Sequence, residues 1–275
     1  MIDRRVSVFQ ITLLFLYLVA AVTFAWGRLR PDSRFVKLLH IVAFVTTLAG
    51  IVLHTNYLLR GVFEDGALSL SLPAAASLIG LQLAIIALFA AIDPALRGMS
   101  AGLLLLASPA AFATHRLVES ATPENLTWQL QTHVFSSMFA YGLLTAGAIV
   151  AIYALVQDRR LRAARISAIN KLFAPLETTE RLLFAVSMAG FIVLAMSVIT
   201  GMTFIENLFA QHLVHKTVLS LLALVLFGVL VAGRILAGWR GRRAVYLYLA
   251  GFALLCLAYF GSRVILEVVL GRHWG

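Results

Sequence analysis

The chain has 275 residues, of which 61% are hydrophobic and only 12% are charged, and its formal net charge is +10. Soluble domains carry about 25% charged residues, so this composition excludes an ordinary soluble protein and indicates one that lies in a lipid bilayer. Most of the bases fall between apolar runs, which is typical of membrane topology rather than of a nucleic-acid-binding face. We therefore expect membrane lipid around the chain and no nucleic acid among its partners.

Apolar runs bounded by charged, proline or glycine residues occupy nearly the whole chain. Because a hydrocarbon core of about 30 Å takes roughly 20 residues of helix, the chain has room for about eight spans and no soluble domain. Backbone polar groups in lipid must pair internally, so the runs predict helices. We predict an all-α, polytopic integral membrane helical bundle that forms a single transmembrane domain over residues 1–275. Its predicted helices lie at about 6–26, 35–58, 68–92, 100–116, 132–156, 182–205, 217–236 and 244–270. We expect the first to be retained rather than cleaved as a signal peptide, because its apolar stretch exceeds the usual length.

Lysine and arginine residues predict the orientation. Alternate connections collect 15 of the 22 bases on one side, and the positive-inside rule assigns that side to the cytoplasm. Both termini are then extracytoplasmic. The basic connection 157–181 is predicted to be a cytoplasmic loop that anchors the topology, and its charges also suit anionic headgroups.

On this topology six of the seven histidines lie toward the extracytoplasmic end. These are His54, His115, His133, His212, His215 and His273, and only His40 falls at the other end. Neutral imidazole is a common ligand of metals and of haem iron, so histidines from separate segments at one membrane face suggest a site. Any one of them alone is more often a helix-end residue or an interhelical hydrogen bond than a ligand, but their clustering keeps both interpretations open.

Neighbouring polar residues give some histidines more context. His133, Ser137 and Tyr141 recur every four residues and therefore predict a polar face on one helix. Arg60 and Arg263 are candidates to hold haem propionates. The alternative is a structural role, in which each side chain extends from a helix end so that its charge reaches the membrane interface. His215 and His212 are either two ligands on one helical turn or solvated loop residues.

Motifs for other chemistry are absent from the sequence. It contains no G-x-x-x-x-G-K, G-x-S-x-G or H-E-x-x-H pattern. The single cysteine, Cys256, excludes an internal disulfide and a C-x-x-C-H haem attachment. We expect no catalytic residues and therefore a protein that is not an enzyme.

Several short segments, in order and spacing, resemble the cytochrome c assembly transmembrane family that includes CcsA, CcmC and HemX-like proteins. The similarity is greatest to its short, eight-helix, YpjD-like branch of the inner membrane. The segments are Leu53–Gly61, His133–Gly142, Ala146–Leu155, Pro175–Leu182, Thr200–Gly201, His215–Ser220, Gly238–Ala244 and Ala258–Arg263.

This resemblance implies haem handling at the outer face of the bacterial inner membrane, for cytochrome c assembly. The implied cofactor is haem b, and the implied partners are haem and other membrane or cytochrome c assembly proteins. His133 matches the family's external haem histidine and His54 the histidine of the second helix. His273 follows the last helix, where some members place a second external histidine. His133 and His54 are thus the implied ligands of haem iron.

The sequence departs from the family pattern where a tryptophan-rich WWD segment should present haem. The stretch Ile205–Lys216 contains no tryptophan, and Gly233–Arg234 replaces a histidine that longer members carry. A second hypothesis is therefore a non-haem membrane scaffold or accessory subunit that has lost the haem-presenting segment. A third is a metal-ion permease that uses the outer histidines and methionines.

Overall fold

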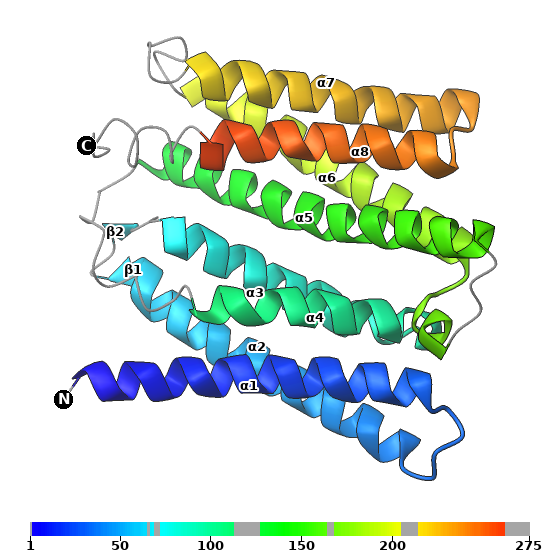
Figure 1. Ribbon diagram of the computed structural model, residues 1–275. Coiled ribbons are helices and arrows are strands. Elements are labelled where there is room, and N and C mark those ends of the chain that lie inside the picture. The colour runs from blue at the N-terminus through cyan, green and yellow to red at the C-terminus, as the bar shows by residue number, and fades with distance from the viewer. Residues whose placement is uncertain are drawn as a thin grey trace. The chain divides into compact units, whose positions relative to one another are not determined.

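The computed structural model describes residues 2–64, 67–68, 72–112, 127–163, 168–204 and 214–261. Within these ranges the chain forms eight α-helices and two strands of two residues each (Figure 1). The helices are α1 (Ile2–Leu29), α2 (Val36–Val62), α3 (Leu72–Ala90), α4 (Arg97–Phe112), α5 (Trp128–Arg162), α6 (Leu176–Phe204), α7 (Val214–Ala237) and α8 (Gly241–Cys256). Strands β1 (Phe63–Glu64) and β2 (Ala67–Leu68) pair antiparallel after α2. The predicted all-helical membrane class is confirmed.

Six of the described helices are long and apolar enough to cross a membrane: α1, α2, α5, α6, α7 and α8. The apolar part of α3 covers Ala74–Ala90, and α4 has 16 residues. A helix of 16 residues spans about 24 Å at 1.5 Å per residue, which is less than a hydrocarbon core of about 30 Å. The fourth predicted run is the shortest of the eight, and α4, which corresponds to it, is one of the two shortest α-helices. The other is α8, which also has 16 residues but continues as the π-helical turn η4 (Leu257–Gly261).

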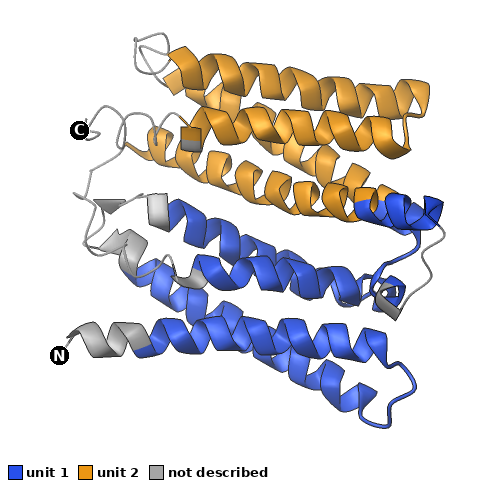
Figure 2. Ribbon diagram, in the orientation of Figure 1, with its two compact units in different colours: residues 1–126, 156–179 blue, residues 127–155, 180–275 orange. Residues whose placement is uncertain are grey.

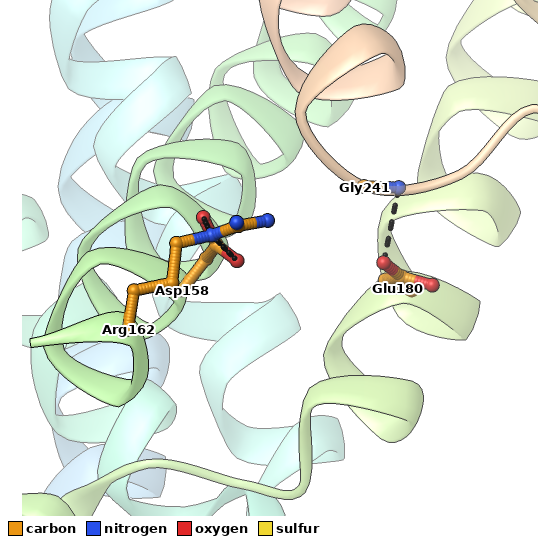
Figure 3. Close-up of polar contacts among 4 residues, drawn as sticks. All are labelled: Asp158, Arg162, Glu180 and Gly241. Carbon is orange, nitrogen blue, oxygen red and sulfur yellow. Dashed lines mark hydrogen bonds and ion pairs between the residues drawn. The ribbon is translucent and has the colours of Figure 1, made fainter. Parts of the chain in front are cut away.

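The connection expected at 157–181 is largely helical. The apolar pattern ends the fifth helix at residue 156, but α5 continues to Arg162, where Arg162 Nε lies 3.1 Å from Asp158 Oδ1 one turn earlier (Figure 3). A short 3₁₀ helix, η3 (Ala168–Leu172), precedes Pro175, and α6 begins directly after that proline. Apolar patterning locates the part of a helix that lies in lipid, whereas charged residues extend the same helix into water.

The described chain separates into two compact units (Figure 2). Unit 1 comprises residues 1–126 and 156–179, and unit 2 comprises residues 127–155 and 180–275. In unit 1, α1 packs against α2 and α4, and α3 packs against α4 and α2. In unit 2, contacts of α5 with α6 and α8, and of α7 with α6 and α8, hold the four helices together.

Helix α1 illustrates how an apolar helix divides its faces in a membrane. Leu13, Tyr17 and Phe24 are fully buried, whereas Phe15 on another face is 58% exposed. Large apolar side chains on the outer face would be unfavourable in water, but they are favourable in the hydrocarbon of a membrane. The apolar exterior and the buried stripe together explain the all-round hydrophobicity of the sequence.

A defined turn joins α7 to α8 in unit 2. Gly238 and Gly241 both have φ of 62°, a left-handed conformation that glycine adopts without strain. Arg234 Nη1 donates to Trp239 O at 3.0 Å. Figure 3 shows the second contact of the turn, in which Gly241 N donates to Glu180 Oε1 at 3.0 Å. Glu180 on α6 thereby accepts from an N–H at the start of α8, where a negative charge also complements the helix dipole.

Candidate functional site

His133 lies near the beginning of α5 in unit 2 and is half-buried against α6. Its Nδ1 lies 2.9 Å from Ser197 O and 3.3 Å from Thr200 Oγ1. The ring packs so closely on Gly201 that a Cβ at that position would lie 2.8 Å from His133 Cε1. One turn of α6 therefore provides both the hydrogen bonds and the space that hold this imidazole.

The hydrogen bonds around His133 form a closed network between α5 and α6. Ser137 Oγ donates to His133 O at 2.7 Å, and Ser197 Oγ lies 2.6 Å from Ser137 Oγ. Since Ser137 uses its proton on His133 O, Ser197 is the donor in the pair of hydroxyls. The hydrogen bond from His133 Nδ1 to Ser197 O then completes the network.

The hydrogen bond to Ser197 O determines which tautomer of the His133 imidazole is present. A carbonyl oxygen only accepts, so Nδ1 must carry the proton that bonds Ser197 O. In the neutral imidazole the lone pair is then on Nε2, which has no hydrogen-bond partner among the residues that the structure describes. A backbone carbonyl bound to one ring nitrogen is the arrangement that orients many metal-ligating histidines.

The polar face predicted on α5 lies against other helices of unit 2. Tyr141 is buried and its hydroxyl donates to Leu255 O at 2.9 Å on α8. Its ring contacts Tyr259 of the π-helical turn η4, with ring centroids 5.6 Å apart. His133, Ser137 and Tyr141 thus share one face as predicted, and each has a hydrogen-bond partner on a neighbouring helix.

His54 has a different environment in unit 1. It is fully buried, with Nδ1 3.1 Å from Tyr17 Oη and Nε2 2.7 Å from Ser77 Oγ. The three residues come from α1, α2 and α3, so the histidine joins three helices. Both ring nitrogens are engaged, and a metal at Nε2 would have to displace Ser77.

Two of the remaining predicted site residues lie within the described structure, one in each unit. His215, in the first turn of α7, and Arg60, in the last turn of α2, are both exposed. Among the described residues, no group of three or more His, Cys, Asp or Glu side chains is placed to hold a metal ion. The predictions for His273, Arg263, His115 and His212 lie outside the described residues.

Sequence reasoning did not identify the α6 residues that surround His133. Ser197, Thr200 and Gly201 lie at spacings of three and four residues, so they share one face of α6. A stripe of small and hydroxyl-bearing residues in an apolar helix marks a helix contact and could have indicated where a polar residue of another helix packs.

The chain was compared with known families and proteins. The family model described as cytochrome C assembly protein matches residues 13–270. The inner membrane protein YpjD of Escherichia coli (strain K12) is 29% identical over 271 residues, which cover 95% of this chain and 99% of that protein. An Azospirillum brasilense protein described as an uncharacterized 28.8 kDa protein in the nifR3-like 5'region is 32% identical over 144 residues, or 52% of this chain and 53% of that protein. No solved structure matches the chain.

The match to an inner membrane protein over almost its full length agrees with the six long apolar helices. The chain is therefore a multi-pass protein of the bacterial inner membrane. The matching family is described as one of cytochrome c assembly and not as a classical enzyme family. Because the family model covers most of its length, the chain belongs to the cytochrome c assembly protein family, and this membership supports a role in cytochrome c biogenesis.

Proposed function

We propose that this protein binds haem b through Nε2 of His133 and handles it for cytochrome c assembly at the extracytoplasmic face of the inner membrane. The observation that carries the proposal is the hydrogen bond of 2.9 Å between His133 Nδ1 and Ser197 O. It supports the proposal because it leaves the lone pair on Nε2 and limits rotation of the ring.

The surroundings of His133 fit one axial ligand of haem. Haem, when bound, supplies an iron that accepts an imidazole lone pair, and the protein's own part is to orient that imidazole and present an apolar surface. Trp128 and Phe204, at the ends of the same two helices, have ring centroids 6.2 Å apart and are 68% and 40% exposed. These aromatic faces are suited to contact a porphyrin.

The second ligand and the propionate partners remain predictions. His215 and His273 are candidates for the other axial position, and Arg60 and Arg263 for the propionates. His54 is a weaker candidate, because iron at its Nε2 would break the 2.7 Å contact with Ser77 Oγ.

The test is the absorption spectrum of the full chain, purified from cells that are well supplied with haem. We expect the wild-type protein to show a Soret band and His133→Ala to lose most of it, since the ligand to iron is removed. Thr132→Ala is the matched control, because Thr132 is exposed on the adjacent position and bonds only within its own helix, to Trp128 O at 2.9 Å. This control is expected to keep the wild-type spectrum.

A rescue experiment separates ligation from a purely structural role of His133. Free imidazole added to His133→Gly should restore the Soret band, because it supplies the missing nitrogen without restoring the covalent link between the ring and α5. Colourless wild-type protein, or a His133→Ala variant with the full wild-type band, would refute the haem proposal.

A second candidate function is a non-haem scaffold or accessory subunit of cytochrome c assembly. Two observations favour it: the absence of tryptophan in Ile205–Lys216 and the engagement of both ring nitrogens of His54. It predicts that His133→Ala leaves cytochrome c levels unchanged while substitutions at Trp239 or in Arg159–Arg165 lower them. Haem-stained gels of membranes from complemented deletion strains distinguish the two.

A further inference from the structure

Three bases meet at the end of unit 1 where α1 finishes and α4 begins. Arg28 lies in the last turn of α1, His40 near the start of α2, and Arg97 at the first position of α4. Arg97 Nη1 donates to His40 Nδ1 at 3.1 Å, and Arg28 is close enough to interact electrostatically with both. We name Arg28, His40 and Arg97 the base cluster.

Two N–H groups of the base cluster are buried and have no acceptor among the described residues. A guanidinium only donates, so Nδ1 of His40 is the acceptor for Arg97 and the proton of the neutral ring lies on Nε2. His40 Nε2 and Arg28 Nε are both buried and have no hydrogen-bond partner within the part of the chain that the structure describes. Buried donors are normally satisfied, so the pair indicates an acceptor that comes from outside these residues.

A nearby acid offsets only part of the positive charge of the base cluster. Arg28 uses Nη2 on Phe173 O at 3.5 Å, and Arg97 uses Nε on Ala91 O at 3.1 Å, both of which are uncharged acceptors. Asp93 acts electrostatically on Arg97 without forming an ion pair with it, and its Oδ1 accepts from Ala95 N at 2.8 Å. No carboxylate of the described residues forms an ion pair with the cluster. The missing acceptor should therefore be an anion.

We propose that the base cluster binds an anionic phosphate group. Phosphate has several acceptor oxygens, and guanidinium groups pair with it through directed, charge-assisted hydrogen bonds. The cluster lies at the end of the apolar spans of α1 and α2, where Trp26, Leu38 and Ile41 are about half exposed or more. The phosphate of an anionic lipid headgroup and free inorganic phosphate share this chemistry. The site lies in unit 1 and does not depend on haem binding by His133.

Native mass spectrometry of the full chain in detergent tests the proposal. Phosphatidylglycerol and phosphatidylcholine are titrated separately, and inorganic phosphate is added as a competitor. We expect phosphatidylglycerol to bind at least about tenfold more tightly than phosphatidylcholine, and Arg28→Gln or Arg97→Gln to remove most of that preference. Competition by millimolar inorganic phosphate would identify a site for the free ion, and its absence a site for the headgroup; either result supports a phosphate site.

Arg34→Gln is the matched control, because Arg34 is exposed at the same end of unit 1 and its guanidinium lies over the Phe35 ring at 4.6 Å. It should bind phosphatidylglycerol as the wild type does. Arg28→Gln leaves the bond between Arg97 and Ala91 O intact, so we expect this variant to fold. Its thermal unfolding in detergent, measured together with lipid binding, checks that it does. Equal binding of the two lipids by the wild type, or equal loss in Arg34→Gln and Arg28→Gln, would overturn the proposal.

Discussion

The chemistry open to each histidine depends on the atoms around its two ring nitrogens. His54 is bonded to hydroxyl groups on both sides and serves to join α1, α2 and α3. Among the described residues the His133 imidazole is bonded at Nδ1 only, to groups of α6, and it is half-buried rather than enclosed. The resemblance to the family implies both as ligands, because a match of residue types does not show whether a hydroxyl from another helix reaches the imidazole.

Gly201→Ala tests whether α6 holds the His133 ring. The new methyl group would lie 2.8 Å from His133 Cε1, so the ring must move and its bond to Ser197 O must lengthen. Overpacking of this kind costs about 1–3 kcal/mol. The expected result is a lower free energy of unfolding, measured by thermal or SDS-induced unfolding of the detergent-solubilised protein.

Gly102→Ala is the control for that substitution. A Cβ at Gly102 meets nothing within 4 Å, so alanine there should be neutral or should stabilise α4 by up to about 1 kcal/mol through its helix propensity. Equal effects of the two substitutions would show that Gly201 does not make room for His133.

At the scale of elements, the helical segments were predictable and their ends were not, and six of the described helices are long and apolar enough to cross a membrane. Transfer of apolar residues into lipid depends on each stretch of about 20 residues by itself, so the predicted runs coincide with helices. The ends depend on contacts with distant residues. Gly241, for example, meets Glu180 although the two are 61 positions apart in the chain.

Glu180→Ala tests that contact. Without the carboxylate, Gly241 N loses its acceptor at the beginning of α8, and loss of a cap costs about 1 kcal/mol. We expect a lower unfolding temperature and faster proteolysis of the turn between α7 and α8. Asp158→Ala is the comparison, since Asp158 and the 66% exposed Arg162 form a surface pair one turn apart, a type worth about 0.3–0.5 kcal/mol. A loss in Glu180→Ala no greater than in Asp158→Ala would contradict a capping role.

For the whole molecule, the distribution of bases predicts an orientation. With 15 of the 22 lysines and arginines on one side, both termini should be extracytoplasmic. A C-terminal alkaline phosphatase fusion is therefore expected to be active, and a C-terminal green fluorescent protein fusion to be dark. The reverse pattern would place His133 at the cytoplasmic face and would exclude haem handling on the outer side.

The sequence by itself determined that this is an all-helical membrane protein and that it resembles the cytochrome c assembly family, because hydrophobicity and ordered short segments are properties of the chain read in order. Tertiary structure decided which polar groups meet. His133 finds Ser197 at a separation of 64 residues, His54 finds Tyr17 at 37, and Arg97 finds His40 at 57. Such partners are set by how helices pack across one another, and that packing is governed by the shapes of many side chains at once rather than by any local pattern.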